Sequence, residues 1–279
     1  MSYIKPEQII DSMIQTGTIK SQLSIKRLLL RGVLAGALLG VATTLAYQTA
    51  VQTKINMAGA LIFPVGFVMI VLLGLELVTG NFALLPLSVL ERKTKVLHML
   101  RNWSWVFVGN MVGAILYGLL YYIAITKFGH VKDDPITAMI IKAAETKTVG
   151  YKSFGFDGFV TVFVKSMLCN WMVCLGAVMA MTSQSTGGKI AAMWLPIITF
   201  FGQGFEHSVV NMFVIPTGML MGAKVSFADW WLWNQIPVTL GNLVGGLLFT
   251  GLALYFSHKR AVPTPPVEEQ HVAKSTSNM

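Results

Sequence analysis

The sequence contains few charged residues, and this scarcity argues against a water-soluble fold. Asp, Glu, Lys and Arg make up 12% of the 279 residues, whereas a soluble domain carries about a quarter. Hydrophobic residues make up 54%, and the mean hydropathy is +0.64. This composition is typical of a polytopic membrane protein, in which lipid surrounds most of the chain.

Cysteine is also scarce, and common catalytic and cofactor motifs are missing. Cys169 and Cys174 lie five positions apart in one apolar run, a spacing that matches neither a metal knuckle nor a redox pair. No second histidine stands at ligand spacing, and there is no nucleophile elbow and no phosphate loop. We therefore expect no metal, no other cofactor and no enzymatic activity. The alternative from another class is a membrane-embedded enzyme that uses Glu206 and His207 as acid and base.

The formal net charge of +9 does not indicate nucleic-acid binding, because the basic residues fall in loops beside apolar spans. They are better interpreted as orientation signals. Arg92, Lys93, Lys95 and Arg101 lie on the same expected side as the basic terminal clusters, which places both termini in the cytoplasm. The segment 127–157 also contains lysines, but it is long and carries several acidic residues.

Apolar runs divide the chain into three parts. Residues 1–28 are expected to form a cytoplasmic amphipathic helix along the membrane surface, residues 29–257 a transmembrane transport domain, and residues 258–279 a disordered, cytoplasmic, Pro-rich tail. Within the transmembrane domain we expect single spans near 31–50, 103–126, 158–182 and 231–257, with a loop over 127–157. The regions 57–90 and 190–221 are too long for one span and contain Pro and buried polar residues, so each should break in its middle.

Two motifs occur twice in the sequence. Residues 74–86 and 204–216 both obey Gly-x-Glu-x4-Asn-x4-Pro, and the Gly-Asn-x-x-Gly of residues 109–113 returns at 241–245. A set of three spans is therefore repeated once. Because three is an odd number, the second copy must enter the membrane from the opposite side. The predicted fold class is an all-α membrane protein with six transmembrane helices, an inverted three-plus-three repeat and broken second and fifth helices.

Three segments together resemble the formate/nitrite transporter family. They are Gly-Phe-Glu-His-Ser-Val-Val-Asn-Met-Phe at 204–213, Glu-Leu-Val-Thr-Gly-Asn at 76–81 and Leu-Cys-Asn-Trp-Met-Val-Cys-Leu at 168–175. The resemblance covers about residues 5–257, and residues 211–216 look more like the formate branch than the nitrite branch.

The resemblance implies an aquaporin-like protomer in a homopentamer, with one pore in each protomer and a place in the cell (inner or plasma) membrane. It also implies passage of small monovalent weak-acid anions, with formate favoured over nitrite, hydrosulfide or lactate. A neutral-solute pore of the aquaporin type is a nearer rival than an enzyme, but the paired Asn-Pro-Ala signature is missing.

His207 is the candidate central residue, because it is the only histidine deep inside an apolar region. An imidazole can change charge near neutral pH or donate a hydrogen bond to an anion. The resemblance implies that Thr79 faces this histidine and that Asn170 and Asn211 lie beside the pore. Each amide could then offer two donors to a carboxylate, although hydrogen bonding between helices is the alternative role.

Further candidates for the path follow from the same resemblance. Leu77, Val78 and Phe200 should form the apolar constrictions, and a lysine, Lys152 or alternatively Lys147, should attract anions to the outer vestibule. Three polar residues at the helix breaks, Glu76, Asn81 and Glu206, are expected to have structural roles.

A bare monovalent anion should not cross an apolar constriction, because it would lose its water without compensation. Our hypothesis is that Lys152 raises the local anion concentration and that a proton, taken from solvent or through His207, neutralises the anion for passage. The result would be anion–proton symport or channel-like flux.

Overall fold

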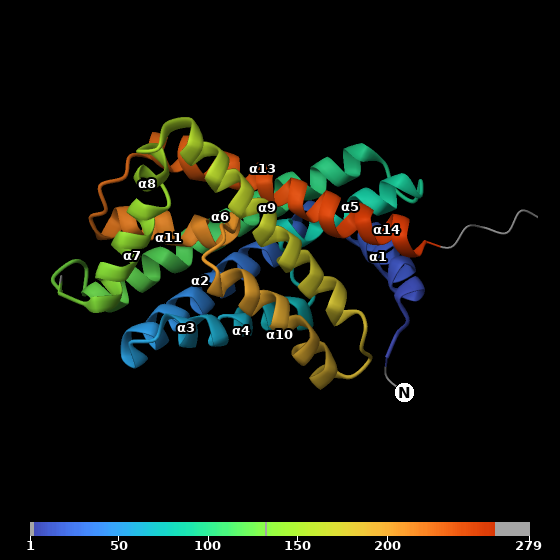
Figure 1. The fold of residues 1–279 in the computed structure, drawn as a ribbon, viewed down its shortest axis with the longest axis horizontal. Coiled ribbons are helices and arrows are strands. Elements are labelled where there is room, and N and C mark those ends of the chain that lie inside the picture. Colours follow the sequence, from blue (N-terminus) through green and yellow to red (C-terminus); the bar gives the residue numbers. More distant parts are fainter. Residues whose placement is uncertain (1–2, 132, 260–279) are drawn as a thin grey trace, which may run out of the picture.

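The computed structural model describes residues 3–131 and 133–259, and within these ranges the chain is helical apart from loops and an isolated bridge between Tyr3 and Ser183. The prediction of an all-α fold is confirmed. Most of the expected tail, residues 260–279, lies outside the described residues. Figure 1 shows an elongated bundle with α1 and α14 at one end and α7 and α8 at the other.

Among residues 3–131 and 133–259, four helical stretches are long and apolar enough to cross a membrane. They are α2 (Ile25–Thr53), α6 (Val96–Thr126), α9 (Gly155–Ala180) and the stretch Phe227–His258. The last stretch is continuous, but it alternates between α-helix and π-helix. Its parts are α12 (Phe227–Trp230), the π-helical η1 (Trp231–Gln235), α13 (Ile236–Val244), the π-helical η2 (Gly245–Leu252) and α14 (Ala253–His258).

Shorter helices fill the two regions in which breaks were expected. The first contains α3 (Asn56–Ile62), α4 (Pro64–Leu72) and α5 (Val78–Leu90), and the second contains α10 (Thr186–Gly202) and α11 (Ser208–Met221). The chain leaves the helical conformation at 73–77 and again at 203–207. The breaks are therefore where the repeated motif predicts them, whereas the count of six membrane crossings stays a prediction.

The repeated Gly-Asn-x-x-Gly motif brings helices into close contact. A Cβ atom at Gly113 of α6 would collide with the Val33 carbonyl of α2, and one at Gly245 would collide with the Met167 carbonyl of α9. Small residues allow this approach in lipid, where van der Waals packing rather than water exclusion holds helices together.

Gly113→Ala is therefore expected to lower the free energy of unfolding by about 1–3 kcal/mol, because the new methyl group must push two backbones apart. Gly187→Ala is the matched control, since a Cβ there meets nothing within 4 Å. The stability of both variants is compared through the midpoint temperature of thermal unfolding in detergent. Equal midpoints for the two variants would contradict the close-packing account.

The N-terminal amphipathic helix is present as α1 (Pro6–Ser21), and its apolar face packs on α5. That the helix lies along the membrane surface stays a prediction. Ile10 and Met13 are buried in a cluster with Leu84 and Leu87 of α5. The Ser88 hydroxyl also donates a hydrogen bond to the Ile14 carbonyl, 2.7 Å away. This packing partner could not be predicted, because the local sequence does not place α5 beside residues 1–28.

A polar contact also joins α1 to the end of the last helical stretch. Lys259 Nζ lies 3.3 Å from Asp11 and 3.5 Å from Glu91, which follows α5. The Tyr255 hydroxyl donates to Glu91, and this hydrogen bond, together with Lys259, holds the pKa of the Glu91 carboxyl below its usual range.

The expected loop 127–157 is largely helical, which corrects the sequence prediction. It contains α7 (Pro135–Thr146) and the single turn α8 (Val149–Lys152). Asp134 caps α7 by accepting from Thr137 N, and Ile136 and Ile140 are buried. The buried side of α7 packs mainly on α11. Because the segment also contains many charged residues, the amphipathic pattern of α7 was not recognised in the sequence.

Candidate functional site

Each helix break contains a glycine in the left-handed backbone conformation. Gly74, after α4, has φ 61°, and Gly204, after α10, has φ 65°. A Cβ at either position would meet nothing within 4 Å, so the left-handed backbone, rather than lack of space, requires glycine. Both α5 and α11 thus begin inside the protein, and their N-termini carry partial positive charge.

Asn110 of α6 holds the chain in place at the first break through three hydrogen bonds. Its Nδ2 donates to the carbonyls of Gly32 and Glu76, at 2.9 and 2.8 Å, and its Oδ1 accepts from Val78 N at 3.0 Å. The first backbone N–H of α5, which no residue of that helix can satisfy, is therefore bonded by a buried side chain.

Asn242 of α13 forms three equivalent hydrogen bonds at the second break. Its Nδ2 donates to the carbonyls of Ser166 and Glu206, at 2.8 and 2.9 Å, and its Oδ1 accepts from Ser208 N at 2.8 Å. The Asn of each Gly-Asn-x-x-Gly motif consequently has one function, which explains why the motif occurs twice.

A lysine, a glutamate and two asparagines form a network at the first break. Glu76 accepts from Lys20 Nζ and from Asn81 Nδ2, both at 2.8 Å. Asn81 Nδ2 also lies 2.8 Å from Asn102 Oδ1, and Asn102 Nδ2 donates to the Lys20 carbonyl at 3.0 Å. Glu76 is 1% exposed, so its charge is compensated almost wholly by protein groups.

The second break carries the same network, with one added hydroxyl. Glu206 accepts from Lys147 Nζ and Asn211 Nδ2 at 2.8 Å, and from the Tyr151 hydroxyl at 2.9 Å. Asn211 Nδ2 lies 2.9 Å from Asn234 Oδ1, and Asn234 Nδ2 donates to the Lys147 carbonyl at 2.8 Å. The residues expected to be structural at the breaks all take part in these two networks.

Thr79 and His207 meet where α5 and α11 begin. Thr79 Oγ1 lies 3.0 Å from His207 Nε2, and both side chains are buried. His207 is the N-cap of α11, and its Nδ1 accepts from Val210 N at 3.2 Å. A neutral imidazole that accepts at Nδ1 carries its proton on Nε2, so His207 donates to Thr79 and leaves the Thr79 hydroxyl proton free.

Aromatic rings cover one side of this pair. Phe200 stacks on His207 with ring centroids 5.7 Å apart and 25° between the planes. Phe63 packs edge-on against Phe200 at 5.7 Å and stacks on Phe201 at 3.9 Å. Sequence reasoning did not identify Phe63, because a phenylalanine in an apolar run carries no signal that separates a constriction from ordinary packing.

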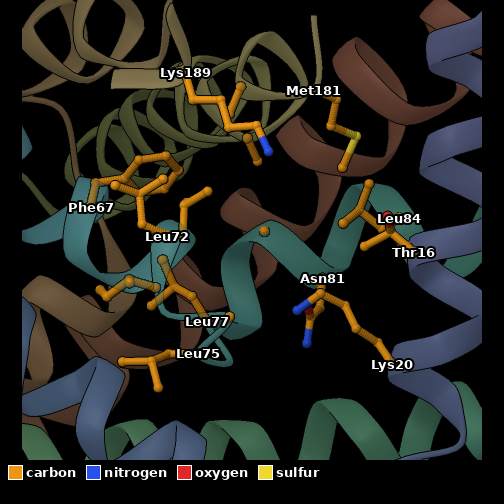
Figure 2. Close-up of a pocket in the computed structure, with 16 residues that line it drawn as sticks. Thr16, Lys20, Phe67, Leu72, Leu75, Leu77, Asn81, Leu84, Met181 and Lys189 are labelled. Atoms are coloured by element: carbon orange, nitrogen blue, oxygen red, sulfur yellow. The ribbon is translucent and has the colours of Figure 1, made fainter. Parts of the chain in front are cut away.

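A cavity of about 310 Å³ lies between the first helix break and α1. It is bounded by residues of α1, α4, α5, α9 and α10, and Leu77 and Asn81 are among the lining residues labelled in Figure 2. Val78 does not line this cavity; it lines a shallow groove with Phe82, Trp103 and Thr239. Of the two constriction candidates from this break, only Leu77 therefore lies on the cavity.

The two pore-side asparagine candidates use their donors within the protein. Asn170 Nδ2 bonds the carbonyls of Thr79 and Asn242, at 3.0 and 2.6 Å, and Asn211 Nδ2 bonds Glu206 and Asn234. Only the Oδ1 atoms of the two amides have no partner among the described residues. In this conformation neither side chain can give two donors to a carboxylate.

The two candidate lysines differ in their surroundings. Lys152 is half exposed and pairs with Asp229 of α12 at 2.8 Å. Lys147 is largely buried and bonds Glu206, the residue directly before His207. Lys147 is therefore the lysine next to the break. Elsewhere among residues 3–131 and 133–259, no three His, Cys, Asp or Glu side chains are grouped closely enough to hold a metal ion.

Comparison with known sequences gives matches along nearly the whole chain. The pattern of the formate/nitrite transporter family matches residues 7–256. The "Probable formate transporter" of Methanothermobacter thermautotrophicus is 40% identical over 206 residues, which cover 71% of this chain and 73% of the relative. The "Formate channel BtFdhC" of Bacillus thuringiensis is 31% identical over 271 residues, 93% of this chain and 98% of the relative.

Solved structures share the fold. A structure described as "FNT family ion channel" has a TM-score of 0.79 and 25% identity, and the match covers 90% of this chain and 98% of the other. A second, "Pentameric formate channel with formate bound", has a TM-score of 0.68 and 26% identity, with coverage of 84% and 97%.

Proposed function

The chain belongs to the formate/nitrite transporter family, and we propose that it carries formate together with a proton through a pore in each protomer. It is a multi-pass membrane protein of a family of transporters and channels, and we assign it no enzymatic activity. The observation that carries the proposal is the Thr79–His207 pair at the start of two helices, with the apolar Phe200 stacked on the histidine.

The apolar flanks determine which species can pass. Phe200 stacks on His207 and packs against Phe63, and Leu77, two residues before Thr79, lies on the wall of the cavity. An ionised carboxylate would lose its hydration there without a compensating charge, whereas the neutral acid would not. The Lys147–Glu206 and Lys20–Glu76 pairs lie at the two breaks. Because each pair consists of one positive and one negative group, neither adds net charge beside the path.

The hydrogen bonds of His207 indicate its part in this passage. A proton added at Nδ1 would point at the Val210 N–H and would break the bond that caps α11. His207 therefore stays neutral and holds Thr79, whose free hydroxyl proton is available to a carboxyl oxygen. The proton that neutralises formate then comes from solvent, which is the first of the two routes considered from the sequence.

The assembly and orientation follow from the relatives and from charge. A similar solved structure is pentameric, which supports a homopentamer in the lipid bilayer. Arg92, Lys93 and Lys95, between α5 and α6, lie on the side of α1, so the positive-inside rule supports cytoplasmic termini and a cytoplasmic N-terminal segment. Lys147 would then lie towards the outer vestibule.

Uptake by proteoliposomes tests the proposal, with formate, nitrite, hydrosulfide and lactate supplied in parallel and an internal pH dye. We expect formate uptake to be fastest and to acidify the lumen, because the neutral acid dissociates after entry. Protein-free vesicles correct for diffusion of formic acid through lipid. Faster nitrite or lactate uptake would reassign the substrate, and absence of flux for all four would overturn the function.

A further inference from the structure

The helices α2 and α6 begin side by side at one end of the molecule. They run in the same direction, since a Cβ atom at Gly32 would lie 3.1 Å from the Gly109 Cα atom and one at Gly40 would meet the ring of Tyr117. Arg101 of α6 also donates to two carbonyls of the link between α1 and α2, at 2.8 and 3.1 Å. The first turns of α2 and α6 are therefore held at the same level of the bundle.

Three exposed cations gather at these two helix starts. Lys26 and Arg27 lie in the first turn of α2, and Lys95 is the N-cap of α6. None of the three forms an ion pair with a carboxylate of residues 3–131 and 133–259. The sequences of α2 and α6 themselves contain no Asp or Glu. The charge of these three residues, which we call the basic patch, is thus uncompensated on both helices.

The internal repeat shows that the fold does not require cations at these positions. In the second half of the repeat, α9 and the stretch Phe227–His258 take the places of α2 and α6, and they too pack closely, because a Cβ at Gly245 would collide with α9. Their first turns carry Asp157 and Asp229 instead. An acidic side chain stabilises a helix N-terminus, whereas a cation is unfavourable there. Helix stability and helix packing therefore do not account for the basic patch.

The helix lengths place the basic patch at the surface of the membrane. The 29 residues of α2 and the 31 of α6 correspond to about 43 and 46 Å, whereas the hydrocarbon core of a bilayer is about 30 Å thick. Each helix extends beyond this core, and its charged first turn, rather than its apolar middle, lies in the headgroup layer. The next turns of the two helices expose four leucines, which are Leu30, Leu34, Leu97 and Leu100.

We propose that the basic patch binds the headgroup of an anionic phospholipid in the leaflet on the side of α1. The lipid phosphate accepts hydrogen bonds from Lys26, Arg27 and Lys95, and the acyl chains lie along the exposed leucines that follow on α2 and α6. Each Lys or Arg at a membrane surface strengthens binding of anionic lipid by about fivefold. The positive-inside rule explains such residues only as orientation signals during insertion, so the proposal gives them a function in the folded protein.

Thermal unfolding of the purified full chain in detergent micelles tests the lipid site, with phosphatidylglycerol or the zwitterionic phosphatidylcholine added with the same acyl chains. Phosphatidylglycerol is expected to raise the midpoint temperature more than phosphatidylcholine, because a ligand that binds the folded chain stabilises it. In the variant Lys26→Gln/Arg27→Gln/Lys95→Gln, the phosphatidylglycerol concentration that gives half of this rise should increase by about tenfold or more. The rise is measured from each variant's own midpoint without lipid, so a change in basal stability does not affect the comparison.

Two control variants separate the lipid site from general charge. The first, Lys26→Arg/Arg27→Lys/Lys95→Arg, keeps all three charges and should respond to phosphatidylglycerol like the unchanged chain. The second removes three exposed lysines that lie away from the starts of α2 and α6: Lys54→Gln, Lys142→Gln and Lys224→Gln. It should also respond like the unchanged chain.

Three results would overturn the proposal. The first is the same dependence on phosphatidylglycerol in the glutamine variant of the basic patch and in the unchanged chain. The second is an equal rise with phosphatidylcholine in the unchanged chain, which needs no variant to be measured. The third is an equal rise with inorganic phosphate at the same concentration, because the ligand would then be a free anion and not a lipid. None of these measurements uses formate, so the result holds whatever the chain transports.

Discussion

Glu206→Gln is expected to lower the free energy of unfolding by about 3–5 kcal/mol, because it leaves the Lys147 ammonium group without its counter-charge in a largely buried position. The glutamine keeps the size of the side chain and can still bond Asn211, so the loss reports the charge. Chemical unfolding in detergent, followed by tryptophan fluorescence, measures it.

The double variant Lys147→Met/Glu206→Gln is the decisive comparison for this pair. Removing both charges should recover much of the loss, because no unpaired ion remains in the interior. Lys152→Met is the matched control: the Lys152–Asp229 pair has the same 2.8 Å separation but a half-exposed lysine, so its loss should cost less than about 1 kcal/mol. If the losses of stability from Lys147→Met and from Glu206→Gln simply added up in the double variant, Lys147 and Glu206 would not be a coupled pair.

Thr79→Val is expected to reduce formate flux by about tenfold or more while the protein stays folded. Valine has nearly the same shape, but it leaves the Nε2–H of the buried His207 without an acceptor, at a cost of about 1–3 kcal/mol. It also removes the hydroxyl proton that we assign to the substrate. Initial rates of uptake into proteoliposomes measure the effect, and each 1.4 kcal/mol corresponds to about a factor of ten.

Thr79→Ser is the control for this change, because it keeps the hydroxyl and removes only a methyl group. Its flux should stay within a few-fold of that of the unchanged protein. If Thr79→Val and Thr79→Ser had equal flux, the hydroxyl would have no part in transport, and the pair at the centre of the path would be a packing contact.

The helix breaks could be predicted because they are local and repeated. A glycine that turns the backbone, a glutamate and an asparagine recur at the same spacing in residues 74–86 and 204–216, and polar groups at membrane depth are costly unless they are paired. The partners of these groups could not be predicted. Lys20 and Glu76 are 56 positions apart, and Lys147 and Glu206 are 59 apart, so only the folded chain pairs them.

Side-chain direction was the second limit. The sequence places Leu77 and Val78 next to each other, but only Leu77 lines the cavity, because α5 begins at Val78 and turns that side chain towards Trp103. For Asn170, the sequence gives a buried amide and cannot show that the carbonyls of Thr79 and Asn242 use both of its N–H groups. Both outcomes depend on neighbours from distant helices.

The central claim is that formate crosses as the neutral acid past Thr79 and His207. Its most direct test is labelled formate uptake at several membrane voltages, set by potassium gradients with valinomycin, with luminal pH recorded at the same time. The account predicts uptake that does not depend on voltage and that acidifies the lumen by one proton per formate. Uptake that follows voltage without acidification would show that the bare anion passes, and would contradict the account.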